Sequence, residues 1–430
     1  MIFEIEKDVW FDSEKLYIIK GKDNYEKFNE KYEEYTYPAR TQKKREYPVI
    51  TFLSTTCCNL KCTYCYAGQG TYNNVSKENS FSYENYIKAY ECTMTEYGGV
   101  KGICFFGGEP LLNFIEIKKF VQYLYNEKPH LELPFISIGS NGTIMNEEII
   151  DFISEYNIAF GTSLDGVKKY NDLCRIGDNV SSVYDEVVKT LYTLGNKKVL
   201  TSLQFTFNKV HLENYKKGDV IKWVEEFEKL PISFYEIIAA TTENEFNHVD
   251  LKDKEILESY EMLCNDLAEY SLKCLANGKT TIMSVIFAFI IVSIGKRRVA
   301  GHCGAGKNIT IAPDLRVYPC HVVASDINNG VKCEPGFRKA INSNEKFQDM
   351  IALDRNNVDK CQGCIAKNLC SVFCKGMCSA KPVNPPVERC LMMRIFVERT
   401  ISFMVNDYPN CKDTVMTSIR KVLKAHGVIL

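Results

Sequence analysis

Short β-rich runs alternate with longer helical patterns across residues 47–240, and this alternation limits the chain to few folds. Intervening stretches such as "EEIIDFISEY" and "VYDEVVKTLYTL" repeat apolar residues at helical spacing. Repeated strand and helix units predict an α/β fold with a parallel sheet, open or barrel-like, and helices outside it. The predicted strands, each rich in β-branched and aromatic residues, are "YPVITFLS", "VKGICFF", "PFISIGS", "IAFGTSL", "VLTSLQFTF" and "PISFYEIIAA".

Polar or glycine-containing clusters follow the first four of these strands. They are "STTCCNLKCTYC", "GGEP", "SNGT" and "LDG", in chain order. The carboxyl ends of parallel strands meet at one edge of a sheet, where the sites of such folds form. We therefore expect the four clusters to converge on one cavity.

The charge pattern excludes some classes of partner. The formal net charge is −1 and no basic block is present, which argues against nucleic acid or an anionic membrane surface. The longest apolar run, Ile282 to Ile294, has 13 residues, fewer than the ~18 to 20 that span a bilayer. It predicts a buried core helix. Because the N-terminal stretch also lacks the features of a signal peptide, we expect a cytoplasmic protein with a small or peptidic partner.

The chain has 19 cysteines, which in a reducing cytoplasm are metal ligands, catalytic thiols or small buried side chains. Cys58, Cys62 and Cys65 form a C-x3-C-x2-C set after the first strand, and no histidine lies near them in sequence. A zinc site in this loop would lack its fourth ligand. Three thiolates suit a 4Fe-4S cluster with one iron left open. The neighbouring Cys57 is expected to point into the core or away from the cluster.

This cysteine set, with the aromatic Tyr64 before its last member, resembles the signature of the radical SAM superfamily. In that family the open iron binds the amino and carboxylate groups of S-adenosylmethionine, and one electron cleaves it to methionine and a 5′-deoxyadenosyl radical. The resemblance covers roughly residues 48–240. It implies a partial (β/α)6 TIM-like barrel with a further cysteine-rich domain.

Other strand ends carry the same resemblance. "FGGEP" matches the family motif whose glycines let the backbone approach the methionyl amino group, although a plain β-turn reads the same way. "SNGT" lies where the family contacts the ribose, and "SLDG" with Arg175 resembles the pair on the carboxylate, which an arginine fork suits. Leu203 is at the position that packs against the adenine in this family, and the alternative interpretation is an ordinary leucine of the hydrophobic core. The implied cofactor contacts are Tyr64, Gly107, Gly108, Glu109, Ser140, Asn141, Ser163, Arg175 and Leu203.

A second group of cysteines has the spacing C-x2-C-x5-C-x3-C, with two more before it and one after it. Two zinc sites are one interpretation. The arrangement also resembles the SPASM extension of radical SAM enzymes, which houses two auxiliary 4Fe-4S clusters. The resemblance assigns Cys361, Cys364, Cys370 and Cys390 to the distal cluster, and Cys303, Cys320 and Cys374 to the proximal one.

The chain departs from the SPASM pattern at two positions. Fully ligated members carry a further cysteine where this chain has Arg297, so an open proximal iron is expected, and a substrate thiolate would suit it. The pattern expects glycine where this chain has Leu315, so the turn in "PDLRVYPC" is expected to differ. Cys333 and Cys378 are candidates to replace an assigned ligand.

The residue after Cys320 separates candidate reactions. Anaerobic sulfatase maturases carry "CD" there, with the Asp as proposed base, whereas this chain has His321 in "YPCHVV". "YPCH" resembles maturases that form thioether links, from cysteine sulfur to carbon, in ribosomally made peptides. His321 is then a hydrogen-bond partner of the cluster, a proton acceptor or a structural residue. The alternatives are a carbon–carbon link, an epimerisation or an oxidation on a peptide or small molecule, a sulfatase-maturase-like activity, and a non-enzymatic metal scaffold or electron carrier.

The expected partners are a cysteine-containing precursor peptide with its leader and a flavodoxin- or ferredoxin-type electron donor. Such maturases often bind the leader as an added strand, and the first 46 residues suggest a reduced recognition element of two strands and a turn. The auxiliary-cluster segment is expected to be held by metal rather than by a large core. The predicted segments are 1–46, the core 47–250, a helical bridge 251–300, the auxiliary-cluster domain 301–392 and terminal helices 393–430.

Overall fold

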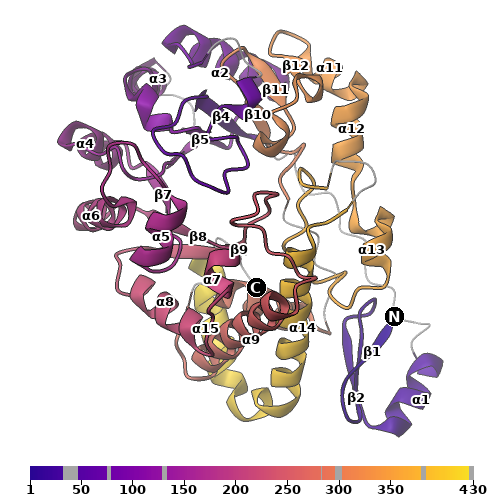
Figure 1. Ribbon diagram of the computed structural model, residues 1–430. Helices are drawn as coiled ribbons and strands as arrows, with labels where there is room; N and C mark the ends of the chain where they lie inside the picture. Colours follow the sequence, from indigo (N-terminus) through magenta and orange to yellow (C-terminus); the bar gives the residue numbers. More distant parts are fainter. Residues whose placement is uncertain are drawn as a thin grey trace.

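The computed structural model describes residues 1–31, 47–74, 79–127, 133–281, 283–295, 303–378 and 384–425. A nine-stranded sheet crosses the molecule in the order β12-β11-β10-β4-β5-β6-β7-β8-β9 (Figure 1). From β4 to β9 the neighbours are parallel and follow chain order. All six predicted strands are confirmed, as β4 (Val49–Thr55), β5 (Gly102–Gly107), β6 (Phe135–Gly139), β7 (Ala159–Ser163), β8 (Thr201–Phe207) and β9 (Phe234–Ala239).

Helices connect these strands and lie outside them, as Figure 1 shows for α3, α4 and α6. Ser82, Asn146 and Ser182 each accept a backbone N–H at a helix start, which satisfies part of the free first turn. The connecting helices are α2 (Tyr83–Tyr97), α3 (Phe114–Glu127), α4 (Glu147–Glu155), α5 (Lys168–Cys174), α6 (Val183–Asn196), α7 (Lys209–Leu212) and α8 (Asp219–Phe227), with short 3-10 turns η1 (Tyr72–Asn74) and η2 (Pro110–Asn113).

Four helices share one buried core with β8 and β9. They are α9 (Lys254–Ala276), α10 (Ser284–Ser293), α14 (Val387–Asn406) and α15 (Tyr408–Ala425). The apolar run from Ile282 is confirmed as a core helix, because Phe287, Ala288 and Ile290 of α10 are buried; Ile282 itself lies outside the described residues. None of the helices in the described ranges has the length and apolar character needed to cross a membrane.

The cysteine-rich segment continues the central sheet. β10 (Ile309–Ile311) pairs in parallel with β4, and β11 (Arg316–Tyr318) and β12 (Val331–Lys332) extend the sheet from there. Ile309, Ile311 and Val317 belong to the same buried core as Phe52 of β4. Packing therefore holds this segment to the rest of the protein. The sequence had predicted a segment held mainly by metal, without this shared core. Its helical elements are η3 (His321–Val323), η4 (Ile327–Asn329), α11 (Phe337–Ser343), α12 (Glu345–Ala352), η5 (Arg355–Asn357) and α13 (Asp359–Gln362).

The turn between β10 and β11 corrects one expectation. Leu315 has φ 59°, the left-handed region for which glycine is the usual residue. The Leu315 backbone N–H donates to Ala312 O at 2.9 Å, and the Ala312 N–H donates to Arg316 O at 3.0 Å. The chain thus keeps a glycine-type backbone at Leu315 and accepts the strain, rather than forming a turn without a left-handed residue.

The N-terminal segment forms three strands rather than the expected two. β1 (Ile2–Glu6), β2 (Val9–Asp12) and β3 (Tyr17–Lys20) make a separate antiparallel sheet, followed by α1 (Lys22–Lys31). This sheet is attached to the C-terminal part of the chain, because Asn368 Nδ2 donates to Ser13 O at 2.8 Å and Lys367 Nζ lies 3.1 Å from Glu14 Oε1. Residues 32–46 of the predicted recognition element lie outside the described residues.

Candidate active site

The first cysteine loop leaves the end of β4 and is fastened to the segment after α5. Leu60 forms an antiparallel bridge with Gly177. Lys61 N donates to the carbonyl oxygen of Ile176 at 2.7 Å, and Thr63 N donates to that of Cys174 at 2.9 Å. These bonds attach the loop to the segment around the end of α5. Cys57 is exposed, so of the two expectations for it, a position in the core is wrong.

The three predicted ligands of this loop are electrostatic neighbours. The charge of Cys65 acts on the thiols of both Cys58 and Cys62. Burial raises the pKa of Cys62 to about 12, against the opposing effect of the Arg175 guanidinium. Thiols of this kind ionise when a metal supplies positive charge. Three neighbouring cysteines on one fastened loop therefore fit the ligand set of a cluster.

The described residues give no support to a compact zinc site. Among them, no three His, Cys, Asp or Glu side chains converge closely enough to hold a single metal ion. A 4Fe-4S cluster distributes its thiolates around several irons and so accepts ligands that are further apart. The assignment of both cysteine groups as cluster ligands stays a prediction.

The two glycines of "GGEP" pack against the cysteine loop. A Cβ on Gly108 would lie 2.1 Å from the backbone oxygen of Cys57, and a Cβ on Gly107, where φ is 134°, would lie 2.4 Å from Thr55 O. The Glu109 N–H donates to Cys57 O at 2.8 Å. Glycine was expected here because of the cosubstrate. The structure adds another reason, which is that the protein's own cysteine loop occupies the space of a side chain.

Gly108→Ala should displace this loop and lower cluster content. A methyl group 2.1 Å from a carbonyl oxygen cannot be accommodated without backbone movement. We expect iron to fall from about twelve to about eight per chain after anaerobic reconstitution, since three clusters hold four irons each. Gly218→Ala is the control for backbone strain without a clash, because its φ is 86° but nothing lies within 4 Å of its added Cβ, and it should keep about twelve irons per chain. Unchanged iron in Gly108→Ala would contradict the prediction.

Glu109 joins the end of β5 to the end of β6. Its carboxylate is fully buried and accepts from Ser140 Oγ at 2.8 Å and from Asn141 N at 2.7 Å. Burial raises the pKa of Glu109 to about 7, although these hydrogen bonds oppose the shift. Asn141 Nδ2 in turn donates to Asn59 Oδ1 of the cysteine loop at 2.8 Å. The first three strand-end clusters are therefore in contact, as predicted, while a shared cavity and their contacts with a cosubstrate stay predictions.

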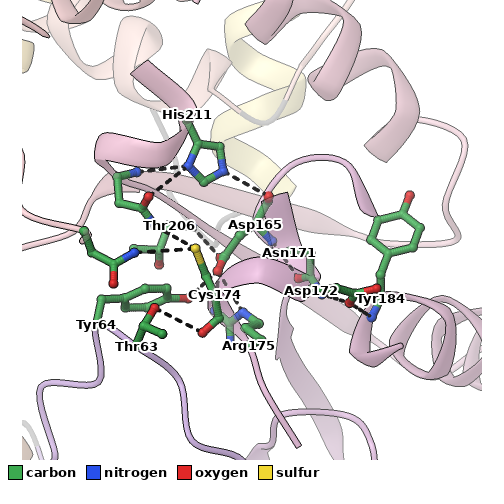
Figure 2. Close-up of polar contacts among 12 residues, drawn as sticks. Thr63, Tyr64, Asp165, Asn171, Asp172, Cys174, Arg175, Tyr184, Thr206 and His211 are labelled. Atoms are coloured by element: carbon green, nitrogen blue, oxygen red, sulfur yellow. Dashed lines mark hydrogen bonds and ion pairs between the residues drawn. The ribbon is translucent and has the colours of Figure 1, made fainter. Parts of the chain in front are cut away.

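Asp165, at the end of β7, brings the fourth cluster to the same place (Figure 2). Its carboxylate is completely buried and accepts two bonds from Arg175, from Nε at 3.0 Å and from Nη2 at 3.1 Å. It also accepts from the hydroxyl of Tyr64, the aromatic residue of the cysteine loop, and from Thr206 N at 3.2 Å. The guanidinium of Arg175 lies 5.6 Å from the centre of the Tyr64 ring.

Sequence reasoning missed Asp165 although it stands inside "SLDG". The available signal was an acidic residue at a strand end next to a glycine, with an arginine ten residues later. The fork of Arg175, expected on a cosubstrate carboxylate, binds Asp165 in the structure. A role of Arg175 toward S-adenosylmethionine stays a prediction, as does that of the half-buried Ser163.

A second layer holds Asp165 in position, and Figure 2 shows His211 above Asp165 and Arg175 below it. The Asp165 N–H donates to Asn171 Oδ1 at 3.1 Å, and its carbonyl oxygen lies 3.1 Å from His211 Nε2. Burial lowers the pKa of His211, so the ring is neutral. Leu203 of β8 is 2% exposed and belongs to the large core around α9 and α14. That position suits the core-leucine interpretation, and its adenine contact stays a prediction.

The C-terminal cysteines separate into two sets. The charges of Cys374 and Cys303 act on Cys320, and Cys303 and Cys320 pack against one small apolar cluster. The other four line a common cavity of about 290 Å³, which Phe3 of β1 and Cys374 also border. Those four are Cys361, Cys364, Cys370 and Cys390. Because Cys374 lines the same cavity, the division of these cysteines into proximal and distal ligands stays a prediction.

His321 lies between the first cysteine loop and the proximal set. Its ring centre is 5.2 Å from that of Phe106 at the end of β5 and 5.8 Å from that of Tyr66. Burial lowers the pKa of His321 to about 4, so the imidazole is uncharged. Cys65 of the first loop and Cys320 of the proximal set both raise the pKa of Tyr66. Tyr66 is therefore close to both cysteine sites. Sequence reasoning did not single out Tyr66, and Arg297 lies outside the described residues.

Residues 52–245 match the Radical SAM superfamily. The cysteine-type anaerobic sulfatase-maturating enzyme of Clostridium novyi is 25% identical over 331 residues, or 74% of this chain and 85% of that protein. An uncharacterized protein of Methanocaldococcus jannaschii is 30% identical over 221 residues, or 50% of this chain and 69% of that one. Native anSMEcpe with bound AdoMet and Cp18Cys peptide has a similar fold, with a TM-score of 0.67 at 19% identity over 84% of this chain and 99% of that chain. The predicted α/β fold class is confirmed.

Proposed function

This chain belongs to the radical SAM superfamily, and we propose that it is a maturase that forms a thioether cross-link in a ribosomally synthesised peptide. It is a radical SAM enzyme with a SPASM-type C-terminal region. The observation that carries the proposal is the convergence of the cysteine loop with the ends of β5, β6 and β7. That site lies beside Tyr66, which is also close to Cys320 of the C-terminal cysteines.

The residues of the chain have separate tasks in this proposal. Cys58, Cys62 and Cys65 hold the first cluster. When bound, it supplies one electron that cleaves S-adenosylmethionine to methionine and a 5′-deoxyadenosyl radical. The glycines of "GGEP" and the buried Glu109 keep the loops around the cosubstrate in place. We propose that Tyr66, Phe106 and His321, whose rings lie near one another, line the peptide site. The 5′-deoxyadenosyl radical would take a hydrogen atom from the acceptor carbon, and a peptide cysteine would lose its thiol proton as its sulfur bonds to that carbon.

The identity and burial of His321 favour thioether formation over sulfatase maturation. Sulfatase maturases of the resembled family carry an aspartate at this position, whereas here a neutral imidazole lies between two aromatic rings. The carboxylate base of that reaction is therefore missing from this position. The auxiliary clusters would accept the electron that thioether formation releases.

Sulfatase maturation is the second candidate, because a relative over 85% of its own length is a cysteine-type sulfatase-maturating enzyme. The solved anSMEcpe complex also holds a cysteine-containing peptide in a similar fold. Both candidates therefore share a peptide substrate. They differ in what happens to the sulfur of the peptide cysteine. Thioether formation keeps the sulfur in the product, whereas sulfatase maturation removes it.

The remaining proposals concern partners and segments. The antiparallel sheet β1–β3 has β1 and β3 as its edges, and an edge strand can accept a leader peptide as an added strand. We propose a flavodoxin- or ferredoxin-type electron donor and a cytoplasmic location. We also propose that the chain divides into the segments 1–46, 47–250, 251–300, 301–392 and 393–430. The cysteine-rich segment among them contributes strands to the central sheet.

Incubation of the reconstituted enzyme with a short cysteine-rich peptide encoded next to it tests the proposal. We expect a product lighter by two hydrogens, with one thiol fewer to alkylate, that depends on S-adenosylmethionine and reductant. The matched control is the same peptide with that cysteine replaced by serine, which should stay unmodified. A product with all its cysteines open to alkylation would contradict the thioether. Formylglycine on a sulfatase-derived peptide would support the second candidate.

A further inference from the structure

Cys378 is one of two buried cysteines, with Cys333, that have no assigned ligand role in the described part of the C-terminal segment. It is 0% exposed and ends a tight turn, in which its N–H donates to Cys374 O at 3.1 Å and to Lys375 O at 3.2 Å. Inside the same turn, a Cβ on Gly376 would lie 3.7 Å from Cys320 Sγ. The turn that carries Cys378 is therefore next to the proximal cysteine set.

The contacts of Cys378 reach both sets. It packs in a small apolar cluster with Val358 and Phe373, on which Cys361 and Cys370 also border. Four cysteines lie close enough to Cys378 that their ionised thiolates would raise the pKa of its thiol, and the effect is largest for Cys374, followed by Cys390, Cys361 and Cys303. A buried cysteine can be a simple small apolar side chain. Cys378 differs from that case because its neighbours are the proposed ligands themselves.

Cys333, the other candidate replacement ligand, does not share this position. It is buried beside Cys92 of α2, whose charge acts on its thiol. It belongs to the core around Phe52 rather than to the clusters formed by the C-terminal cysteines. The structure thus separates two cysteines that the sequence leaves equivalent, and Cys333 becomes a matched control.

The number of thiols decides where Cys378 belongs. A 4Fe-4S cluster is completed by four cysteine thiolates. The predicted distal set already has four members, whereas the predicted proximal set has Cys303, Cys320 and Cys374. Cys303 and Cys374 lie within electrostatic reach of Cys320, although Cys374 also borders the cavity of the distal set. We propose that Cys378 is the fourth ligand of the proximal auxiliary cluster, supplied by a turn of the SPASM-type segment itself.

This assignment changes one expectation about the reaction. With four protein thiolates the proximal cluster has no open iron, so the peptide cysteine reacts without first binding to it. The inference rests on family membership and on the cysteine positions, and it holds whether the product is a thioether or another peptide modification. Failure of the peptide assay would therefore leave it standing.

The experiment uses the full chain with Cys58, Cys62 and Cys65 replaced by alanine, so that only auxiliary clusters remain. This parent should hold about eight irons, and added cyanide should leave the EPR spectrum of its reduced clusters unchanged. Cys378→Ala should open one iron, so that cyanide shifts one signal and mild oxidation releases iron to give a 3Fe-4S signal. Cys333→Ala should match the parent.

Further variants identify the cluster and guard against misfolding. Cys320→Ala should perturb the same EPR signal as Cys378→Ala, and Cys364→Ala should perturb the other one. Cys378→Ser, which keeps the volume and offers an oxygen ligand, should shift that signal without loss of iron. The proposal is overturned if the parent spectrum already responds to cyanide, if both Cys378 variants match the parent, or if Cys378→Ala perturbs the signal that depends on Cys364.

Discussion

Replacement of Cys58, Cys62 and Cys65 together by alanine should reduce 5′-deoxyadenosine formation to background. The three thiols lie on one loop, act electrostatically on one another and are the proposed protein ligands of the first cluster. Without them no electron reaches S-adenosylmethionine. Chromatography of anaerobic reactions with dithionite measures the nucleoside, and iron should fall from about twelve to about eight per chain.

Cys57→Ala is the control for that triple variant, since the Cys57 side chain is exposed and only its backbone oxygen is used by "GGEP". We expect it to retain deoxyadenosine formation and iron content. Continued production of deoxyadenosine by the triple variant would show that the ligands of the first cluster lie elsewhere in the chain.

Asp165→Ala should produce the largest loss of stability among single substitutions in the site. The carboxylate is buried and accepts from both Arg175 nitrogens, from Tyr64 and from Thr206 N. Its removal leaves a buried guanidinium without its counter-charge, which costs about 3–5 kcal/mol. Urea unfolding of the protein prepared without clusters measures this loss. Because Tyr64 is released as well, cluster content should also fall.

The exposed pair of Lys61 and Asp178 provides the matched control. It joins the same cysteine loop to the same segment after α5, at 2.7 Å, but both side chains are more than half exposed. Asp178→Ala should therefore change the free energy of unfolding by about 0–1 kcal/mol. Equal effects of Asp165→Ala and Asp178→Ala would refute a structural role for the buried pair. Asp165→Asn should be intermediate, since it keeps the acceptor oxygen and loses the charge.

Local patterns were sufficient for the strands and most helices of the core. Each of β4 to β9 has a dense apolar run whose own residues favour an extended chain, so its identity does not depend on distant partners. The same holds for α10, where apolar residues occupy every face and predict burial. The spacing of Cys58, Cys62 and Cys65 was similarly informative, because ligands on one short loop need no tertiary contact to come together.

The pairing of short strands with partners far away in the sequence could not be predicted from local patterns. β10 has three residues and pairs with β4 more than 250 positions earlier, and a three-residue run carries too little pattern to identify its partner. The third N-terminal strand was missed for the same reason, since β3 has only four residues. Asp165 was missed because its importance comes from Arg175, Tyr64 and Thr206, which lie on three different elements.

The amino-acid sequence alone determined the α/β core and the cofactor class of this protein, and it predicted a three-cysteine ligand set that leaves one iron open and a second cysteine group resembling the SPASM extension. These features depend on residue type and local spacing. The tertiary structure decided which groups share a location. It paired Arg175 with Asp165, placed "GGEP" against the cysteine loop and separated Cys378 from Cys333. Such neighbours are brought together by packing across the sheet, and sequence distance carries no record of it.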